Sequence, residues 1–194
     1  MAVTYILHGG ETSRENEFND AFFQEFTKHV DKDEVHILHC LFSQEKEKWD
    51  ELFQRLKSAI EAQTSKKVVC TIAQDPLDLL NKLGSHDVLY VAGGQAELIE
   101  PVIPHLENLH NLMQNKVYIG SSMGAFIASS QYVLSFETQE DTQVHYGLGL
   151  VPLSTLCHWD IEKKKQTKID LLKNAAPTTP ILTLDECKYS IFVH

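Results

Sequence analysis

The chain has 194 residues, of which 43% are hydrophobic and 23% are charged, and it carries a formal net charge of −10. This is the composition of a globular protein with a substantial core, and it excludes disordered, collagen-like and coiled-coil architectures. The negative charge opposes binding to nucleic acid or to an anionic membrane surface, so we expect neither as a partner.

Cysteine usage and the N-terminal residues bear on the compartment. The four cysteines, Cys40, Cys70, Cys157 and Cys187, form no CxxC pair, so neither a zinc ribbon nor a redox motif is visible. A chain of this length folds without disulfides. The first residues lack the basic start and apolar stretch of a signal peptide, and no apolar run approaches the roughly 18 residues of a membrane span. We therefore expect a cytoplasmic protein.

Short apolar runs alternate with amphipathic stretches over the first 130 residues. In chain order, we predict a strand at 3–7, a helix at 15–30, a strand at 35–42, a helix at 45–62, a strand at 67–72 and a helix at 76–83. A strand at 88–92 follows, then a helix to about 113 that is interrupted near Pro101 and Pro104, a strand at 116–119 and another helix. Apolar strands that alternate with helices favour a parallel sheet that is covered on both faces.

The rhythm changes after residue 130. We predict extended segments at 133–138 and 144–151, a helix that includes the basic cluster at 163–168 and ends near 174, and a terminal hairpin of 180–184 and 189–193. No repeat or linker divides the chain. We therefore predict a single domain over residues 1–194, of the α/β class, with a doubly wound and mostly parallel sheet.

The strongest motif is Gly-Ser-Ser-Met-Gly at residues 120–124. It matches G-x-S-x-G between a strand and a helix, the setting in which a sharp turn exposes a nucleophilic serine. We predict Ser122 as that nucleophile, with Ser121 as the competing serine. The turn also directs the backbone N–H of Met123 at an oxyanion. The alternative is a small-residue turn that serves only close packing.

A serine nucleophile needs a base and a carboxylate that orients the base. His158 follows the last core strands and is the leading candidate for the base, with His145 as the alternative. Between the serine and His158, the carboxylates available are Glu137, Glu140 and Asp141, and the pattern alone does not choose among them.

A second glycine turn, at residues 92–95 (Ala-Gly-Gly-Gln), also follows an apolar strand. Glycines there let the backbone approach a ligand, and a free N–H could complete an oxyanion hole. The spacing matches neither a dinucleotide-binding fingerprint nor a P-loop. We expect no cofactor and no metal.

Together, VLYVAGGQAELI, VYIGSSMGAFIASS and YGLGLVPLSTLCHW resemble three ordered motifs of the peptidase E (aspartyl dipeptidase) family of serine peptidases, which includes the cyanophycinases. The resemblance covers about half the chain and implies a fold like that of class I glutamine amidotransferases. It assigns Ser122 as the nucleophile, His158 as the base and Glu137 as the acid, because the family has an aspartate at that offset. It places the oxyanion hole on the N–H groups of Gly94 and Met123.

The resemblance also implies substrate contacts. Gln95 stands where the family has an asparagine, and Lys164 is the nearest match to an arginine that binds the substrate's aspartate in the family. A basic patch at Lys164 and Lys168 would give a modest preference for acidic N-terminal residues, because an ammonium recognises carboxylate less specifically than a guanidinium.

The sequence thus predicts a cytoplasmic serine hydrolase that cleaves short peptides, as a monomer or homodimer, with a small peptide as its substrate and neither nucleic acid nor a membrane as a partner. An esterase or amidase on the same scaffold is one alternative, since the same triad serves each reaction. The other alternative is a non-catalytic member of the family that binds a ligand or a partner in the cleft where its relatives bind substrate.

Overall fold

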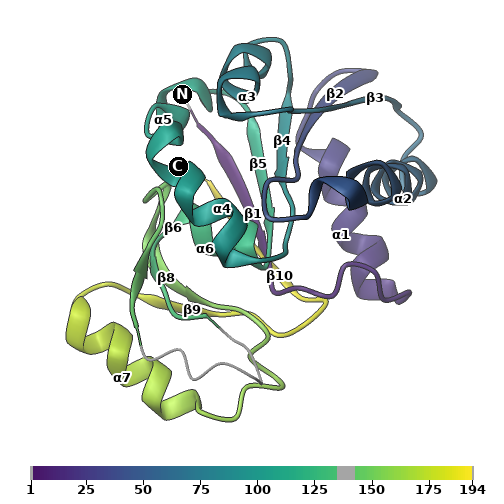
Figure 1. Ribbon diagram of the computed structural model, residues 1–194. Coiled ribbons are helices and arrows are strands. Elements are labelled where there is room, and N and C mark those ends of the chain that lie inside the picture. The colour runs from purple at the N-terminus through teal and green to yellow at the C-terminus, as the bar shows by residue number, and fades with distance from the viewer. Residues whose placement is uncertain (1, 135–142, 194) are drawn as a thin grey trace.

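The computed structural model describes residues 2–134 and 143–193, which form two β-sheets (Figure 1). The larger sheet has six strands in the order β10-β1-β5-β4-β2-β3. They are β1 (Thr4–His8), β2 (Glu34–Cys40), β3 (Lys67–Ile72), β4 (Val88–Val91), β5 (Val117–Ser121) and β10 (Tyr189–Val193). All neighbours are parallel except β1 and β10. The predicted, mostly parallel sheet is confirmed.

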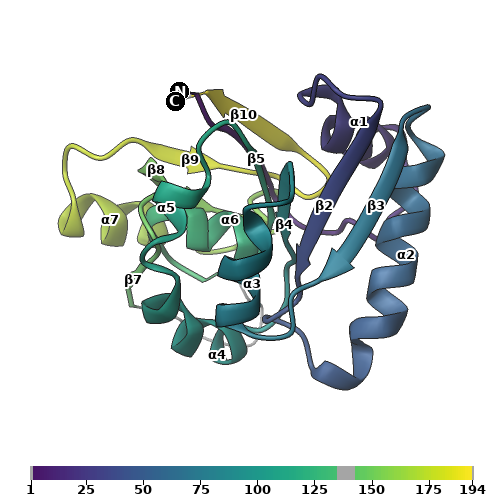
Figure 2. The ribbon, with the colours of Figure 1, turned by 90° about the horizontal axis from the view of Figure 1, so that it is seen from above.

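Helices cover both faces of this sheet (Figure 2). One face carries α1 (Glu17–Lys28) and α2 (Trp49–Ala62), the latter preceded by the 3₁₀ turn η1 (Lys46–Lys48). The other face carries α3 (Pro76–Leu83), α4 (Ala96–Ile99), the 3₁₀ helix η2 (Glu100–Leu106), α5 (Leu109–Leu112) and α6 (Met123–Ala128). The helix expected up to residue 113 is thus three short pieces, since prolines at 101 and 104 break it. This arrangement is the predicted doubly wound α/β fold.

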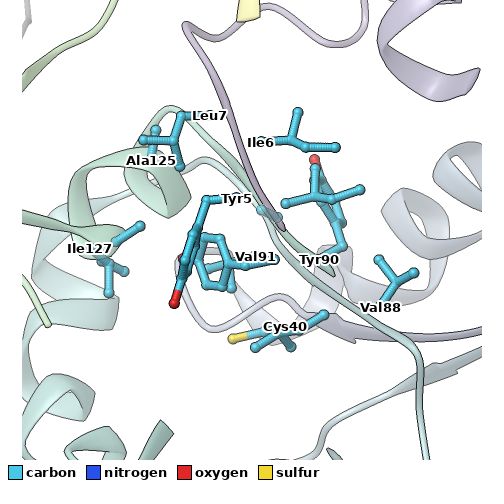
Figure 3. Close-up of a cluster of buried hydrophobic side chains, with 14 of the residues drawn as sticks. Tyr5, Ile6, Leu7, Cys40, Val88, Tyr90, Val91, Ala125 and Ile127 are labelled. Atoms are coloured by element: carbon cyan, nitrogen blue, oxygen red, sulfur yellow. The ribbon is translucent and has the colours of Figure 1, made fainter. Parts of the chain in front are cut away.

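The central strands β1, β4 and β5 are largely apolar because both of their faces are buried, whereas the edge strands β3 and β10 are only partly buried. On β1, Tyr5 and Leu7 point toward α6, whereas Ile6 points to the opposite face, where Tyr90 of β4 lies (Figure 3). All four of these side chains are at most 1% exposed. Alternating sides along a strand are then equally shielded from water, so the alternation of polar and apolar residues expected of a one-sided sheet is missing.

The smaller sheet extends from the end of α6 (Figure 1). Its order is β7-β6-β8-β9, formed by β6 (Ser129–Tyr132), β7 (His145–Tyr146), β8 (Val151–Leu156) and β9 (Ile181–Thr183). Helix α7 (Lys165–Ala175) packs against it through a small apolar cluster that includes Leu156 and Leu172. The segment expected at 144–151 is split, since the irregular residues 147–150 separate β7 from β8. Of the segment expected at 133–138, only residues 133 and 134 are described, and the strand lies earlier, in β6.

The predicted terminal hairpin is wrong. β9 pairs in parallel with β8 in the smaller sheet, whereas β10 pairs antiparallel with β1 in the larger sheet. The edge of β1 would otherwise expose unpaired backbone groups, and β10 covers it. The short connection at 184–188 turns at residues 186–187, where the N–H of Lys188 donates to the carbonyl of Asp185 at 3.2 Å, but it passes from one sheet to the other instead of joining two paired strands. Among helices within the described ranges, none has the length and apolar character needed to cross a bilayer.

Candidate active site

The nucleophile turn joins β5 directly to α6. Ser122 is the one residue between them, and its backbone has φ 48° and ψ −105°, outside the usual regions for a residue with a side chain. Such a conformation costs about 1–3 kcal/mol. The flanking glycines are needed for close packing, because a Cβ at Gly120 would lie 2.4 Å from the carbonyl oxygen of Gly124, and one at Gly124 would lie 2.1 Å from that of Val91. The predicted elbow is therefore present.

His158 lies beside this serine. Its Nε2 is 3.0 Å from Oγ of Ser122, although 36 residues separate them in the chain. The His158 backbone N–H donates to the carbonyl of Gly9 at 3.1 Å, and the imidazole packs over Gly10, where a Cβ would meet the ring at 2.2 Å. The loop after β1 thus fixes the position of the imidazole.

The other imidazole nitrogen contacts a carboxylate that the sequence analysis did not consider. Nδ1 of His158 lies 3.0 Å from Oε1 of Glu186, whose side chain is 7% exposed. A carboxylate can only accept, so Nδ1 carries the proton and Nε2 is free to accept from Ser122. Glu186 occupies the place that we expected for Glu137, which lies outside the described residues, as do Glu140 and Asp141.

Two neighbours hold Glu186 in place. Arg14 donates from Nη2 to its Oε2 at 2.6 Å, and the Glu186 backbone N–H donates to Oδ1 of Asp160 at 2.9 Å. One carboxylate oxygen therefore faces the imidazole while the other is held by a guanidinium. No signal in the sequence marked this residue, because Glu186 stood in the turn of the expected hairpin.

The glycine turn after β4 packs against Ser122. A Cβ at Gly93 would lie 3.1 Å from Cβ of Ser122. The carbonyl of Gly93 accepts from Oγ of Ser43 at 2.8 Å and from Nε2 of Gln44 at 2.5 Å. Because the N–H of Gly94 lies on the opposite side of the same planar peptide, these bonds turn it away from Ser43 and Gln44.

The backbone of Gly94 is extended with positive φ, at 150°, and a Cβ there would lie 2.2 Å from the carbonyl oxygen of Ser43. Only glycine fits this turn without a shift. Within the described ranges, the N–H groups of Gly94 and Met123 donate no hydrogen bond, so both are available to an oxyanion beside Ser122.

A cavity of about 240 Å³ opens beside Ser122 and His158. Besides His158, its lining comes from four strand ends and one helix: Gly10, Glu11, Thr12 and Ser13 after β1; Gln44 after β2; Tyr90, Ala92, Gly93 and Gly94 at the end of β4; Ser121 and Ser122 at the end of β5; and Leu52 and Arg55 of α2. Burial raises the pKa of Tyr90 to about 12, opposed by hydrogen bonds from Thr12 and Ser121 and by the charge of Arg55, so its phenol stays neutral.

Neither expected substrate residue lines this cavity. The side chain of Gln95 instead hydrogen-bonds Glu45. The backbone N–H of Lys164 donates to Glu162, and the buried ammonium of Lys168 also contacts Glu162. The cationic side chain among the described lining residues is Arg55 of α2. Its sequence position did not predict this, because any polar residue on an amphipathic helix is expected to face solvent.

The competing serine is held differently. Oγ of Ser121 is 3.5 Å from Nδ1 of His8, which also accepts the N–H of Gly10 at 3.1 Å. Burial lowers the pKa of His8 to about 4, so this imidazole is neutral at pH 7. Ser121 therefore lacks the carboxylate-supported base that Ser122 has. In the described ranges, no three His, Cys, Asp or Glu side chains come together as metal ligands.

Comparison with known proteins identifies the family of the chain and solved structures that share its fold. The sequence profile of Peptidase family S51 matches residues 5–193. A crystal structure of a peptidase from an acI-B1 actinobacterium is similar, with a TM-score of 0.69 and 15% identity, over 99% of this chain and 84% of that one. A candidate peptidase E protein from Listeria monocytogenes EGD-e has a TM-score of 0.63 and 17% identity, over 100% of this chain and 98% of that one. No curated protein matches the sequence significantly.

Proposed function

The chain belongs to peptidase family S51, and from this membership and the geometry at Ser122 we propose that it hydrolyses short peptides through Ser122, His158 and Glu186. Membership makes the chain a serine peptidase. The identity of the triad acid and the class of substrate are the parts that we propose.

The reaction follows from the contacts. Ser122 attacks the scissile carbonyl while Nε2 of His158 takes its proton, and Glu186 keeps the proton on Nδ1 and stabilises the imidazolium that forms. The N–H groups of Gly94 and Met123 hold the tetrahedral oxyanion. His158 then returns the proton to the leaving amine, and water releases the acyl group from Ser122 by the same steps.

One observation carries the proposal: Oγ of Ser122 lies 3.0 Å from Nε2 of His158 while the Ser122 backbone is held at a φ of 48°. A turn that served packing alone would not need a strained serine, nor a base aimed at its hydroxyl. Backbone strain of this kind persists only where the surrounding structure enforces it, and it concentrates at functional sites.

The size of the cavity supports short substrates. An extended peptide spans about 3.5 Å per residue, so two residues reach about 7 Å. A space of about 240 Å³ beside Ser122 suits a substrate of that length. The same chemistry would also cleave an ester or an amide, and the experiment below includes both.

We propose a cytoplasmic location as well. All four cysteines are free, and Cys40, Cys157 and Cys187 are buried. Burial raises the pKa of the Cys40 and Cys70 thiols to about 12, so these groups are protonated and poorly reactive at pH 7. Such thiols suit a reducing compartment. The proposed partner is a small peptide, bound by a monomer or a homodimer.

The experiment is a hydrolysis screen of free dipeptides, N-acetylated dipeptides, amides and aryl esters, with Ser122→Ala as the blank. We expect free dipeptides to be cleaved, and Ser122→Ala to lose a factor of roughly 10³ or more in kcat/KM. Ser121→Ala is the matched control and should keep activity. Cleavage of esters or amides alone would contradict the peptidase proposal, and equal activity of Ser122→Ala and wild type would contradict the nucleophile.

A further inference from the structure

Among the described residues that line the cavity beside Ser122, Arg55 is the one Lys or Arg. It lies on α2, one turn after Leu52, which lines the same cavity. The positive charge of Arg55 acts on Tyr90, which lines the same cavity, because it opposes the rise in the pKa of the Tyr90 phenol that burial causes. A cation is therefore present at the site, although on a different element from the basic cluster at 163–168.

The Arg55 guanidinium is not neutralised by the protein. Within the described ranges, no carboxylate lies within 4.0 Å of it. Two neighbouring cations differ in this respect, since Arg14 pairs with Glu186 at 2.6 Å and Lys57 of α2 lies 3.8 Å from Glu61. Arg55 thus presents its donors to solvent and to whatever enters the cavity.

A second cavity, of about 400 Å³, meets the first at Arg55. It is lined by residues of α1 and α2 and of the loop before α1, and it shares Thr12, Ser13 and Arg55 with the cavity beside Ser122. Arg55 therefore stands at the boundary between the reacting atoms and a further space that part of a substrate could occupy.

We propose that Arg55 binds a carboxylate of the peptide substrate, an inference that rests on the proposed function. A guanidinium offers paired donors that match the two oxygens of a carboxylate. The chain's net charge of −10 repels acidic ligands at long range, so a local cation is what admits one. Glu11 lines the same cavity, and the site therefore carries one charge of each sign, as a free short peptide does.

The carboxylate has two chemical sources: the side chain of an acidic residue, or the free C-terminus of the peptide. Four substrates separate them: aspartyl-leucine, asparaginyl-leucine and the C-terminal amide of each. The variants are Arg55→Met and Arg55→Lys. Lys57→Met is the matched control, since Lys57 lies two residues away on the same helix and lines neither cavity.

In the wild type, we expect kcat/KM to favour the member of a pair that carries the carboxylate. Arg55→Met should reduce that preference roughly 10- to 100-fold, the range for a lost hydrogen bond between charged groups. Arg55→Lys should restore part of it, and Lys57→Met should leave it at the wild-type value. A preference that follows aspartate identifies an acidic side chain, and one that follows the free terminus identifies the C-terminal carboxylate.

The inference is wrong if Arg55→Met keeps the wild-type preference, or if the wild type cleaves all four substrates equally. It is also wrong if Arg55→Met slows fluorophosphonate labelling of Ser122 as much as it slows hydrolysis, because Arg55 would then act on the triad. Failure of the proposed function looks different: wild-type protein would show neither hydrolysis nor labelling.

Discussion

The turn that holds the proposed nucleophile, Ser122, and the segment that carries the proposed acid, Glu186, are positioned by different means. Ser122 is fixed within five consecutive residues, since the glycines at 120 and 124 permit the turn and the turn exposes the hydroxyl. Glu186 lies on the connection between β9 in the smaller sheet and β10 in the larger one. The first position is a property of local sequence, whereas the second exists only once both sheets have formed.

The loop after β1 ties the two sheets together at this point. Gly9 donates its N–H to the carbonyl of Lys188 at 2.9 Å, and Cys187 donates to the carbonyl of Gly10 at 3.0 Å. A Cβ at Gly9 would lie 2.1 Å from the carbonyl oxygen of Asp185. Glu186 is therefore held on both sides by backbone contacts that no local motif encodes.

The largest loss of activity should come from substituting Glu186, whose position depends on both sheets. Glu186→Gln removes the charge that orients and stabilises the imidazolium, so kcat/KM should fall roughly 10³- to 10⁴-fold with little change in stability. Steady-state kinetics on the best dipeptide measure it. Glu137→Gln is the matched control and should stay within about twofold of wild type. A large loss in Glu137→Gln with a small one in Glu186→Gln would reverse the assignment.

The same difference between local pattern and distant packing decides which parts of the site can be predicted from the sequence. Gly-Ser-Ser-Met-Gly predicted the elbow, and the structure places His158 against Ser122 as expected, because both depend on short-range pattern and strand ends. Glu186 and Arg55 were missed. The first depends on which strand β10 pairs with, and the second on which turn of α2 faces the cavity, and both are decided by packing between distant segments.

The glycine turn after β4 offers a test of a feature that local sequence determines. Gly94→Ala places a Cβ 2.2 Å from the Ser43 carbonyl oxygen and should displace the N–H that we propose for the oxyanion hole. Loss of one such donor costs roughly 10²- to 10³-fold in kcat. Gly84→Ala is the control, since a Cβ there meets nothing within 4 Å. Unchanged kcat in Gly94→Ala would remove Gly94 from the oxyanion hole.

The ion pair between Arg14 and Glu186 can be tested separately from the carboxylate itself. Arg14→Met frees Oε2 of Glu186 but leaves its backbone bond to Asp160. Because the Arg14 side chain is 53% exposed, the pair contributes at most about 1 kcal/mol. We expect a loss of no more than about fivefold in kcat/KM, greater at low salt. A loss as large as that of Glu186→Gln would mean that Arg14 itself contacts the substrate.

The smallest effect on activity is expected for a substitution of His39, a buried imidazole that lies away from the contact between the two sheets. His39 packs between Phe53 and Tyr90, and neither of its nitrogens has a hydrogen-bond partner in the described residues. Burial lowers its pKa to about 3. Between about pH 6.5 and 3 the unfolded state binds a proton there that the folded state does not, so the free energy of unfolding falls as the pH drops.

His39→Leu should remove this contribution, which is worth about 1.4 kcal/mol for each pH unit below 6.5. Urea denaturation at pH 7 and at pH 5 measures it. Relative to wild type, the variant should gain stability at pH 5, with kcat/KM near the wild-type value at pH 7. Equal losses of stability in variant and wild type between the two pH values would show that His39 is protonated in the folded protein.

The most direct measurement is the site and rate of covalent labelling by a fluorophosphonate, followed by mass spectrometry of the intact protein and its fragments. We expect one adduct per chain, on Ser122, which is absent in Ser122→Ala, retained in Ser121→Ala and formed at least 100-fold more slowly in Glu186→Gln. An adduct on Ser121, or a Glu186→Gln protein that labels as fast as wild type, would contradict it.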